Sequence, residues 1–435
     1  ISPERQTEDI PMRWRATQFL KPFCVPFIES YFRNRDRVGL LKLSISGKST
    51  VKEIINPDSV NTDKVVIFAA YPSGKIADMH IRFLERLKSI GYSVILVSNH
   101  RNPLSVFDKC FEKNWTFIFR RPYGRDFGAY KDATIYLHNL SDKNRLRFKK
   151  IIYINDSIAT IEKDELSIIY HLDRGDVDFS GITENYHNGL HVGSFVMSLS
   201  EKAFYHPKII EYWRNFVPLS TRRYAIGRGE LGFSKAMRKA GFVPNVKWTL
   251  SQLKIALLAL PMSKTIEIFD NMEPHFKKNN PMALEVIDRH MEGFLGQNNE
   301  EKNENIFYSS EDLDHYALRA VRYRESFAKL PQELQTSIFE DEVKSSLVDY
   351  IVSYIFRGSN IHHGAAPLLY IGAGLLKKDV VLRRIVQPFD LHTLLERAVG
   401  KDNPDINEIC IEILAKGHPY SLTGWAKVMN DWDFT

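Results

Sequence analysis

The 435-residue chain contains little cysteine, and its cysteines are scattered. Cys24, Cys110 and Cys410 lie far apart and form neither a CxxC nor a CxxH pair. This spacing excludes the common zinc motifs, and three distant cysteines give no disulfide framework. Reduced thiols are typical of a cytoplasmic protein, and we expect this chain to be one.

The sequence also lacks a long apolar run and a long basic run. No segment approaches the roughly 20 apolar residues that cross a bilayer, and the polar residues 1–15 are not a secretory signal. The formal net charge is only +6, from 59 basic and 53 acidic residues. Because a nucleic-acid binder concentrates its positive charge, we expect no nucleic-acid partner. The mild positive balance suits contact with phosphates, on a nucleotide or at an anionic membrane.

Residues 1–60 are predicted to be an N-terminal extension that packs on the core. Residues 19–32 are rich in aromatics but contain Pro22 and Pro26, and burial is favoured for them. The alternative is a peripheral contact with the inner membrane. Because the chain opens on Ile1 instead of methionine, we expect it to be part of a longer, multidomain protein.

Apolar strands alternate with amphipathic helices from about residue 60 to about residue 255. Residues 65–71 are a continuous apolar run, as in a strand covered on both faces, and residues 79–90 carry apolar side chains at helical spacing. Residues 93–98 complete a β-α-β unit, which predicts a parallel sheet in an α/β fold. Further strands are predicted at 116–119, 151–154, 179–183 and 193–198, and further helices at 130–139, 202–216 and 230–240.

The pattern changes after residue 261. Strand-like runs disappear, and residues 345–356 and 388–399 carry apolar side chains at helical spacing. We therefore predict an α/β domain at 61–261 and a mainly helical C-terminal domain at 262–435.

Three polar clusters follow predicted strands, at the edge where open α/β sheets bind ligands. In the first, Gly124 and Gly128 would let backbone N–H groups approach a phosphate beside the positive end of the next helix. Arg125 offers a guanidinium suited to a diphosphate or a carboxylate. The alternative is a tight strand-to-helix connection with a structural pair of Arg125 and Asp126.

The second cluster, Asn155-Asp156-Ser157, ends the strand predicted at 151–154. A carboxylate at this place can bind Mg²⁺ or Mn²⁺, which usually bridge one or two carboxylates to substrate phosphates. The alternative is that Asp156 caps a following turn.

The third cluster opens the helix predicted at 230–240. Glu230 is suited to act as a general base for an acceptor hydroxyl, although the helix dipole alone favours an acidic residue there. Before it lies a polar, aromatic loop suited to contact an acceptor. His187 and His191 are four residues apart, but Gly189 between them indicates a loop instead of a helix face that could bind a metal ion. Hydrogen bonds from this loop to sugar hydroxyls are therefore favoured over a metal site. The candidate acceptor-binding residues are Glu184, His187, His191 and Ser194.

The order of these clusters resembles the rhamnan synthesis protein F family of rhamnosyltransferases. The shared pattern is a GRDFGAYKDA segment, a strand ending in NDS, a DFxGxT segment, an HxxSF strand and an ExGxS helix. A weaker match lies at Gly372–Lys378. The stronger segments are Gly124–Ala133, Asn155–Ser157, Asp178–Thr183, His191–Phe195 and Glu230–Ser234.

This resemblance implies a GT-A-type fold and a nucleotide-sugar donor such as dTDP-rhamnose. It implies that Asp156 holds the donor diphosphate and a metal ion, Mg²⁺ or Mn²⁺, and that Glu230 is the base of an inverting transfer. The acceptor would be a lipid-linked or oligosaccharide precursor of a bacterial surface polysaccharide. The donor-binding residues would be Tyr71, Gly124, Arg125, Asp126, Gly128, Lys131, Asn155 and Ser157.

Two alternatives stay open. One is a sugar-phosphate transferase of the Stealth type, whose YxNDD-like motif resembles Tyr153–Asp156. The other is a non-catalytic glycan-binding subunit of a polysaccharide assembly.

Overall fold

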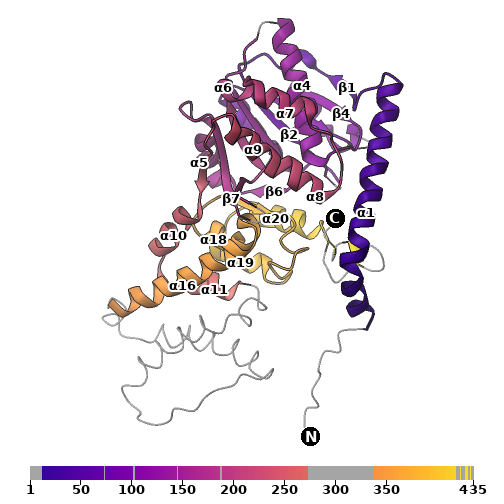
Figure 1. The fold of residues 1–435 in the computed structure, drawn as a ribbon. Helices are drawn as coiled ribbons and strands as arrows, with labels where there is room; N and C mark the ends of the chain where they lie inside the picture. Colours follow the sequence, from indigo (N-terminus) through magenta and orange to yellow (C-terminus); the bar gives the residue numbers. More distant parts are fainter. Residues whose placement is uncertain are drawn as a thin grey trace, which may run out of the picture.

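The computed structural model describes residues 12–72, 74–100, 103–144, 146–186, 189–272 and 338–417, together with 422, 427–429 and 432. These residues form an α/β fold with a large mixed sheet, helices on both of its faces, and a helical C-terminal region (Figure 1). The expected fold class is therefore confirmed at this level.

The main sheet has the strand order β1-β4-β3-β2-β5-β9-β7-β10, with β8 paired to β7. Strands β4, β3, β2 and β5 are parallel and so are β7 and β10, whereas β1 and β9 run antiparallel to their partners. The strand bounds are β1 Val51–Ile55, β2 Lys64–Ala69, β3 Tyr92–Ser98, β4 Thr116–Arg120, β5 Lys150–Asn155, β7 Phe179–Asn185, β8 His191–Val192, β9 Val196–Ser200 and β10 Asn245–Trp248.

Alternate residues of the central strands belong to two hydrophobic clusters, one on each face of the sheet. Val66 and Phe68 of β2 pack with α2 and α5, whereas Val65 and Ile67 pack with α4, α7 and α9. Both faces are covered, which explains why these strands read as uninterrupted apolar runs. The helix bounds are α2 Asp78–Ser89, α4 Arg125–Asn144, α5 Glu162–Asp173, α6 Glu201–Phe204, α7 Pro207–Asn215, α8 Arg222–Tyr224 and α9 Leu231–Lys239.

Several predicted boundaries differ from the structure. Helix α4 begins at Arg125 instead of residue 130. The helix predicted at 202–216 is divided into α6 and α7, because Pro207 starts a new helix whose N-cap is the His206 side chain. The strand predicted at 193–198 begins later, as β9 at Val196, because residues 193–195 form a turn after the short β8.

Helix α1 (Met12–Ile45) lies along one side of the molecule (Figure 1). It packs through Val25, Glu29 and Asp36, and Asp36 Oδ2 accepts a hydrogen bond of 2.8 Å from the Ser220 backbone N–H. The predicted burial of the aromatic residues 19–32 is wrong for three phenylalanines, which point outward. Their exposed fractions are 72% for Phe19, 61% for Phe23 and 78% for Phe27.

The N-terminal segment also contributes to the sheet, since β1 pairs with β4 at its edge. In the described parts of the chain, no helix combines the length and the apolar character needed to cross a membrane.

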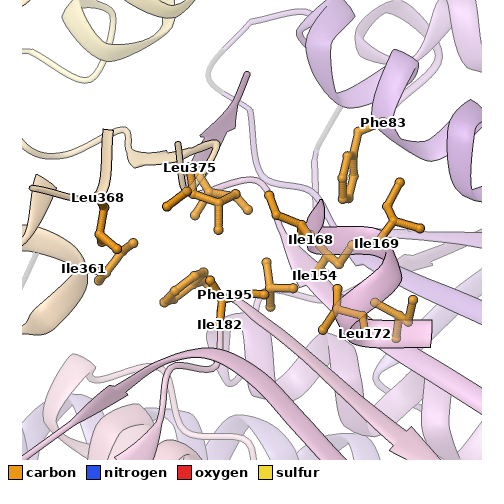
Figure 2. Packing of buried hydrophobic residues seen from close by; sticks show 14 of the residues in the cluster. Phe83, Ile154, Ile168, Ile169, Leu172, Ile182, Phe195, Ile361, Leu368 and Leu375 are labelled. Carbon is orange, nitrogen blue, oxygen red and sulfur yellow. The ribbon is translucent and has the colours of Figure 1, made fainter. Parts of the chain in front are cut away.

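The C-terminal region packs directly against the sheet. Figure 2 shows Phe195 and Ile182 facing Ile361 and Leu368, within one hydrophobic cluster that also contains Leu375. A short strand, β11 (Leu375–Lys377), pairs antiparallel with β6 (Ile158–Thr160), which follows β5. The other elements are α10 Leu250–Ala259, α11 Met262–Asp270, α16 Ile338–Arg357, α17 Asn360–His363, α18 Ala365–Tyr370, α19 Leu391–Val399 and α20 Asp405–Leu414.

Candidate functional site

The end of β5 meets the end of β2 at the carboxyl edge of the sheet. Asp156 Oδ2 accepts a hydrogen bond of 2.7 Å from the backbone N–H of Tyr71, just after β2. The Asp156 backbone N–H donates to the Ala69 carbonyl at 3.0 Å, and the residue is only 5% exposed. Asp156 therefore has a fixed orientation at the place that the sequence predicts.

Asn155 connects this strand end to the start of α4. Its Nδ2 donates to Asp126 Oδ2 at 2.7 Å, while its Oδ1 accepts hydrogen bonds from the backbone N–H and the hydroxyl of Ser157. Tyr71 adds a second connection, because its hydroxyl donates to the Arg125 carbonyl at 3.1 Å. The first two predicted clusters therefore form one site.

The two glycines of the first cluster serve packing. Gly124 has a φ of +81° and lies against Pro218, where a side chain would collide with backbone. Gly128 lies against the Tyr123 carbonyl, and its N–H donates to the Gly124 carbonyl at 2.8 Å. The prediction that Gly128 offers its N–H to a phosphate is therefore wrong, because the helix already uses that group. Arg125 Nε donates to the Ser220 carbonyl at 3.0 Å.

Glu230 ends a π-helical turn, Ala225–Glu230, directly before α9. Its Oε1 accepts a hydrogen bond of 2.6 Å from the Ser194 hydroxyl, and its Oε2 lies 3.5 Å from His191 Nε2. His191 Nδ1 faces the Gly189 carbonyl at 2.7 Å. Since a carbonyl and a carboxylate both accept hydrogen bonds, this geometry fits an imidazolium with a proton on each nitrogen.

The charges of this pair are consistent with that geometry. Burial alone would raise the pKa of Glu230, but hydrogen bonds from His191 and Ser194 outweigh it and lower the pKa. Burial alone would lower the pKa of His191, but Glu230 raises it overall. The Glu230 side chain is 27% exposed, so an ionised carboxylate is accessible to a ligand.

The side chains around Asp156 and those around Glu230 influence each other electrostatically. Burial and the nearby Asp156 raise the pKa of Asp126 to about 6, Lys377 and Arg125 act in the opposite direction, and Glu230 adds to the rise. The backbone also links them: Ser194, which donates to Glu230, precedes Phe195, whose carbonyl accepts a hydrogen bond of 3.1 Å from the Asn155 backbone N–H.

Lys377 is a site residue that the sequence analysis missed. In the pairing of β11 with β6, it lies opposite Ile158, and the Lys378 backbone N–H donates to the Ser157 carbonyl at 2.9 Å. Lys377 Nζ donates to Ser157 Oγ at 2.5 Å and lies 5.0 Å from the Phe195 ring centroid. The weaker resemblance at residues 372–378 was the signal that could have indicated it.

Two predicted site residues have other roles. Lys131 Nζ donates to the carbonyls of Arg214 (3.1 Å) and Phe216 (2.5 Å) at the end of α7, so its prediction as a donor-binding residue is wrong. Glu184 Oε1 accepts hydrogen bonds from the Leu250 backbone N–H (2.9 Å), which starts α10, and from Tyr186. Its predicted acceptor contact has no support here. His187 lies outside the described residues.

The predicted Mg²⁺ or Mn²⁺ stays a prediction. Among the described residues, no three His, Cys, Asp or Glu side chains are grouped to hold a metal ion. One Asp156 oxygen already accepts a backbone N–H, and the Lys377 ammonium is bound to the adjacent Ser157. Hard divalent ions need several oxygen ligands and no adjacent cation, so these side chains do not fit such an ion on their own.

No family model matches the chain. The chain is similar to the uncharacterized protein y4gN of Sinorhizobium fredii, with 26% identity over 211 residues. The match covers 48% of this chain and 52% of that relative, so the chain spans about half the length of the curated relative it matches. That relative is itself uncharacterized, so the similarity assigns no activity to this chain.

Proposed function

We propose that the chain is a glycosyltransferase that moves rhamnose or a related sugar from a nucleotide sugar to the acceptor of a bacterial surface polysaccharide. The observation that carries this proposal is the gathering of Asp126, Asp156, Glu230 and Lys377 at the carboxyl edge of β2 and β5. Open α/β sheets bind nucleotide ligands at this edge. A GT-A-type fold is part of the proposal.

The donor would lie over the Asn155-Asp156-Ser157 strand end. Asp126 and Asp156 are carboxylates suited to accept hydrogen bonds from sugar hydroxyls. Lys377 faces the same edge from β11 and offers a cation to the diphosphate.

Glu230 would receive the acceptor proton. Its lowered pKa keeps it ionised at neutral pH, and Ser194 and His191 orient it. The acceptor oxygen would bond to the anomeric carbon while the bond from that carbon to the diphosphate breaks on the opposite face, inverting the centre. The electron pair of that bond leaves with the nucleoside diphosphate.

A panel of UDP-, GDP- and dTDP-sugars tests this proposal, first in thermal-shift measurements and then by identification of the released nucleotide. We expect one donor to raise the melting temperature, because a ligand that binds only the folded state stabilises it. We expect nucleoside diphosphate as the released product. Release of nucleoside monophosphate would instead identify a Stealth-type transferase. Glycan binding with no nucleotide-dependent stabilisation would identify a non-catalytic subunit.

We also propose that α1 brings the protein to the cytoplasmic face of the inner membrane, where lipid-linked acceptors lie. Its outward stripe Phe19-Phe23-Phe27-Tyr31 has exposed fractions of 72%, 61%, 78% and 65%. The two acidic residues of the helix, Glu29 and Asp36, are turned inward, whereas Arg35, Arg37 and Lys42 are exposed. Exposed aromatics beside basic residues suit an anionic lipid surface.

A further inference from the structure

We propose that Lys377 supplies the positive charge that meets the donor diphosphate, so that sugar transfer at this site proceeds without a bound divalent ion. This inference rests on the proposed glycosyltransferase function. It specifies which group stabilises the negative charge of the leaving diphosphate. It assigns a ligand-binding role to a residue of the C-terminal region.

The position of Lys377 is fixed by backbone pairing with residues 157–161, at the end of the strand-end motif and directly after it. Strand β11 pairs with β6, and the Ile161 backbone N–H donates to the Gly374 carbonyl at 3.0 Å. Gly374 has a φ of +70°, and a Cβ at this position would lie 2.6 Å from the Asp164 Cβ. The backbone therefore requires glycine here, and this requirement fixes the register that places Lys377 opposite Ile158.

The ammonium group lies beside the last residue of the strand-end motif. Lys377 Nζ donates to Ser157 Oγ, one residue beyond Asp156. The following acidic residue, Asp379, already accepts hydrogen bonds from His362 at 2.8 Å and from Arg383 at 2.5 Å. Asp379 therefore has other hydrogen-bond donors, while the hydrogen bond of Lys377 goes to the neutral hydroxyl of Ser157.

Nearby carboxylates favour the charged form of Lys377. Burial lowers the pKa of Lys377, while Asp379, Asp126 and Glu230 act in the opposite direction. A diphosphate next to the amine would further favour the ammonium form. Hydrogen bonds between an ammonium and a phosphate are shorter and stronger than those between neutral groups.

The step balances without a metal. The acceptor oxygen forms a bond to the anomeric carbon, and the bond from that carbon to the diphosphate oxygen breaks. The electron pair of the broken bond stays on the nucleoside diphosphate, and the acceptor proton passes to Glu230. Lys377 stays protonated, and its hydrogen bond moves from Ser157 Oγ to the diphosphate.

The first experiment uses the wild-type chain and needs no variant. Binding of dTDP and of UDP is measured by calorimetry in excess EDTA and again with Mn²⁺, and sugar transfer is measured under both conditions. We expect the better-bound nucleotide to bind with the same affinity in both, and transfer to persist in EDTA.

The second experiment compares variants of two lysines near opposite ends of β5. Lys377→Met removes the charge, and we expect about tenfold or more weaker nucleotide binding, the size of one lost hydrogen bond to a charged group. Lys377→Arg keeps the charge, and we expect it to recover much of the affinity. The control is Lys149→Met. Lys149 precedes β5, is 70% exposed, and pairs with Asp63 at 2.6 Å.

The possible outcomes separate the two proposals. Loss of binding and transfer in EDTA with recovery in Mn²⁺ would overturn the role of Lys377 but leave the glycosyltransferase proposal intact. Wild-type nucleotide affinity in a folded Lys377→Met variant would also overturn the role of Lys377 and leave the glycosyltransferase proposal intact. If neither nucleotide binds and no nucleotide sugar is consumed under any condition, both proposals fail. If Lys377→Met does not fold, the EDTA comparison on the wild-type chain still decides the question.

Discussion

At the scale of single residues, the side chains around Glu230 both orient its carboxylate and keep it ionised. A serine hydroxyl and an imidazole both donate to it, and neither competes with it for a proton from an acceptor. Two donors fix its orientation and keep it ionised in spite of burial. A proton acceptor held in this way needs only a hydroxyl placed beside its exposed edge.

Replacing Glu230 tests this role directly. We expect Glu230→Gln to fold normally, because the amide oxygen can still accept from Ser194, but to lower kcat about 100-fold or more, as for loss of a general base. Donor affinity should change little. Transfer rates and calorimetric nucleotide titrations measure the two effects separately. The matched control is Glu396→Gln, since Glu396 of α19 is similarly exposed, at 30%, and also faces a histidine, His392, at 3.7 Å. Normal turnover in Glu230→Gln would remove this residue from the mechanism.

The pairing of His191 with Glu230 predicts a shift in the pH profile. Removal of the imidazolium leaves burial as the dominant influence on Glu230, which raises its pKa. We therefore expect the acid limb of the kcat profile to move to higher pH in His191→Gln. Lys377 and Asp126, which also face Glu230, are unchanged in this variant. An acid limb at the wild-type position would contradict the pairing.

The same pair predicts how stability depends on pH. Glu230, with its pKa below the ordinary 4.5, stabilises the fold above that pH and loses this effect as the pH falls through its lowered value. His191, with its pKa above the ordinary 6.5, stabilises the fold below that pH and loses this effect as the pH rises. His191→Gln should therefore lower the melting temperature more between pH 4.5 and 6.5 than at alkaline pH.

Residue types and local order predicted only part of the site. Asn155, Asp156 and Glu230 were found because a polar residue directly after an apolar strand, or before an amphipathic helix, has its position fixed by that element. Lys131 was assigned wrongly because it shares a motif with Asp126 but lies five residues along α4, about 140° around the helix axis. Proximity in sequence therefore did not give proximity at the site.

At the scale of elements, strands with long apolar runs could be predicted from the sequence, whereas very short strands could not. Strands β2, β3 and β5 are covered on both faces, and their continuous apolar sequences located them. Strand β11 has three residues and its partner β6 lies more than 200 positions earlier, so no local pattern indicates the pairing. Lys377 was missed for this reason, because its place depends on a long-range contact.

Helix α1 provides the prediction that belongs to this scale. The double substitution Phe23→Ser and Phe27→Ser should leave the fold intact, because both side chains are more than 60% exposed. It should weaken binding to vesicles that contain phosphatidylglycerol, because burial of each aromatic side chain in the membrane interface contributes to binding. Co-sedimentation of the full chain with such vesicles, compared with neutral vesicles, measures the effect.

Two comparisons make this experiment decisive. Val243→Ser is the control, because Val243 is 83% exposed but lies between α9 and β10, away from α1. Equal binding of the wild-type chain and the double variant to anionic vesicles would contradict a lipid role for the stripe. A wild-type dimer that the double variant loses would instead show that a second copy of the chain covers it.

At the scale of the whole molecule, the sheet and the C-terminal region share one core. Ile154, Ile182 and Phe195 of the α/β part pack in the same cluster as Leu368 and Leu375 (Figure 2). The sequence predicted two consecutive domains, because the change in pattern after residue 261 is visible whereas contacts across it are not. A shared core means that the α/β part reaches its native packing only with the C-terminal region in place.

This shared core predicts that the described parts unfold together and that the site depends on both. Leu375 is 1% exposed, so Leu375→Ala should cost about 2–5 kcal/mol and lower a single calorimetric transition. It should also weaken nucleotide binding, because Leu375 precedes Lys377 on β11. Leu137→Ala is the matched control. Leu137 of α4 is also fully buried, but it belongs to the cluster on the opposite face of the sheet, so its replacement should reduce stability with little change in nucleotide affinity. Two well-separated transitions, of which Leu375→Ala shifts only one, would show that the α/β part folds independently and that its site does not require the C-terminal region.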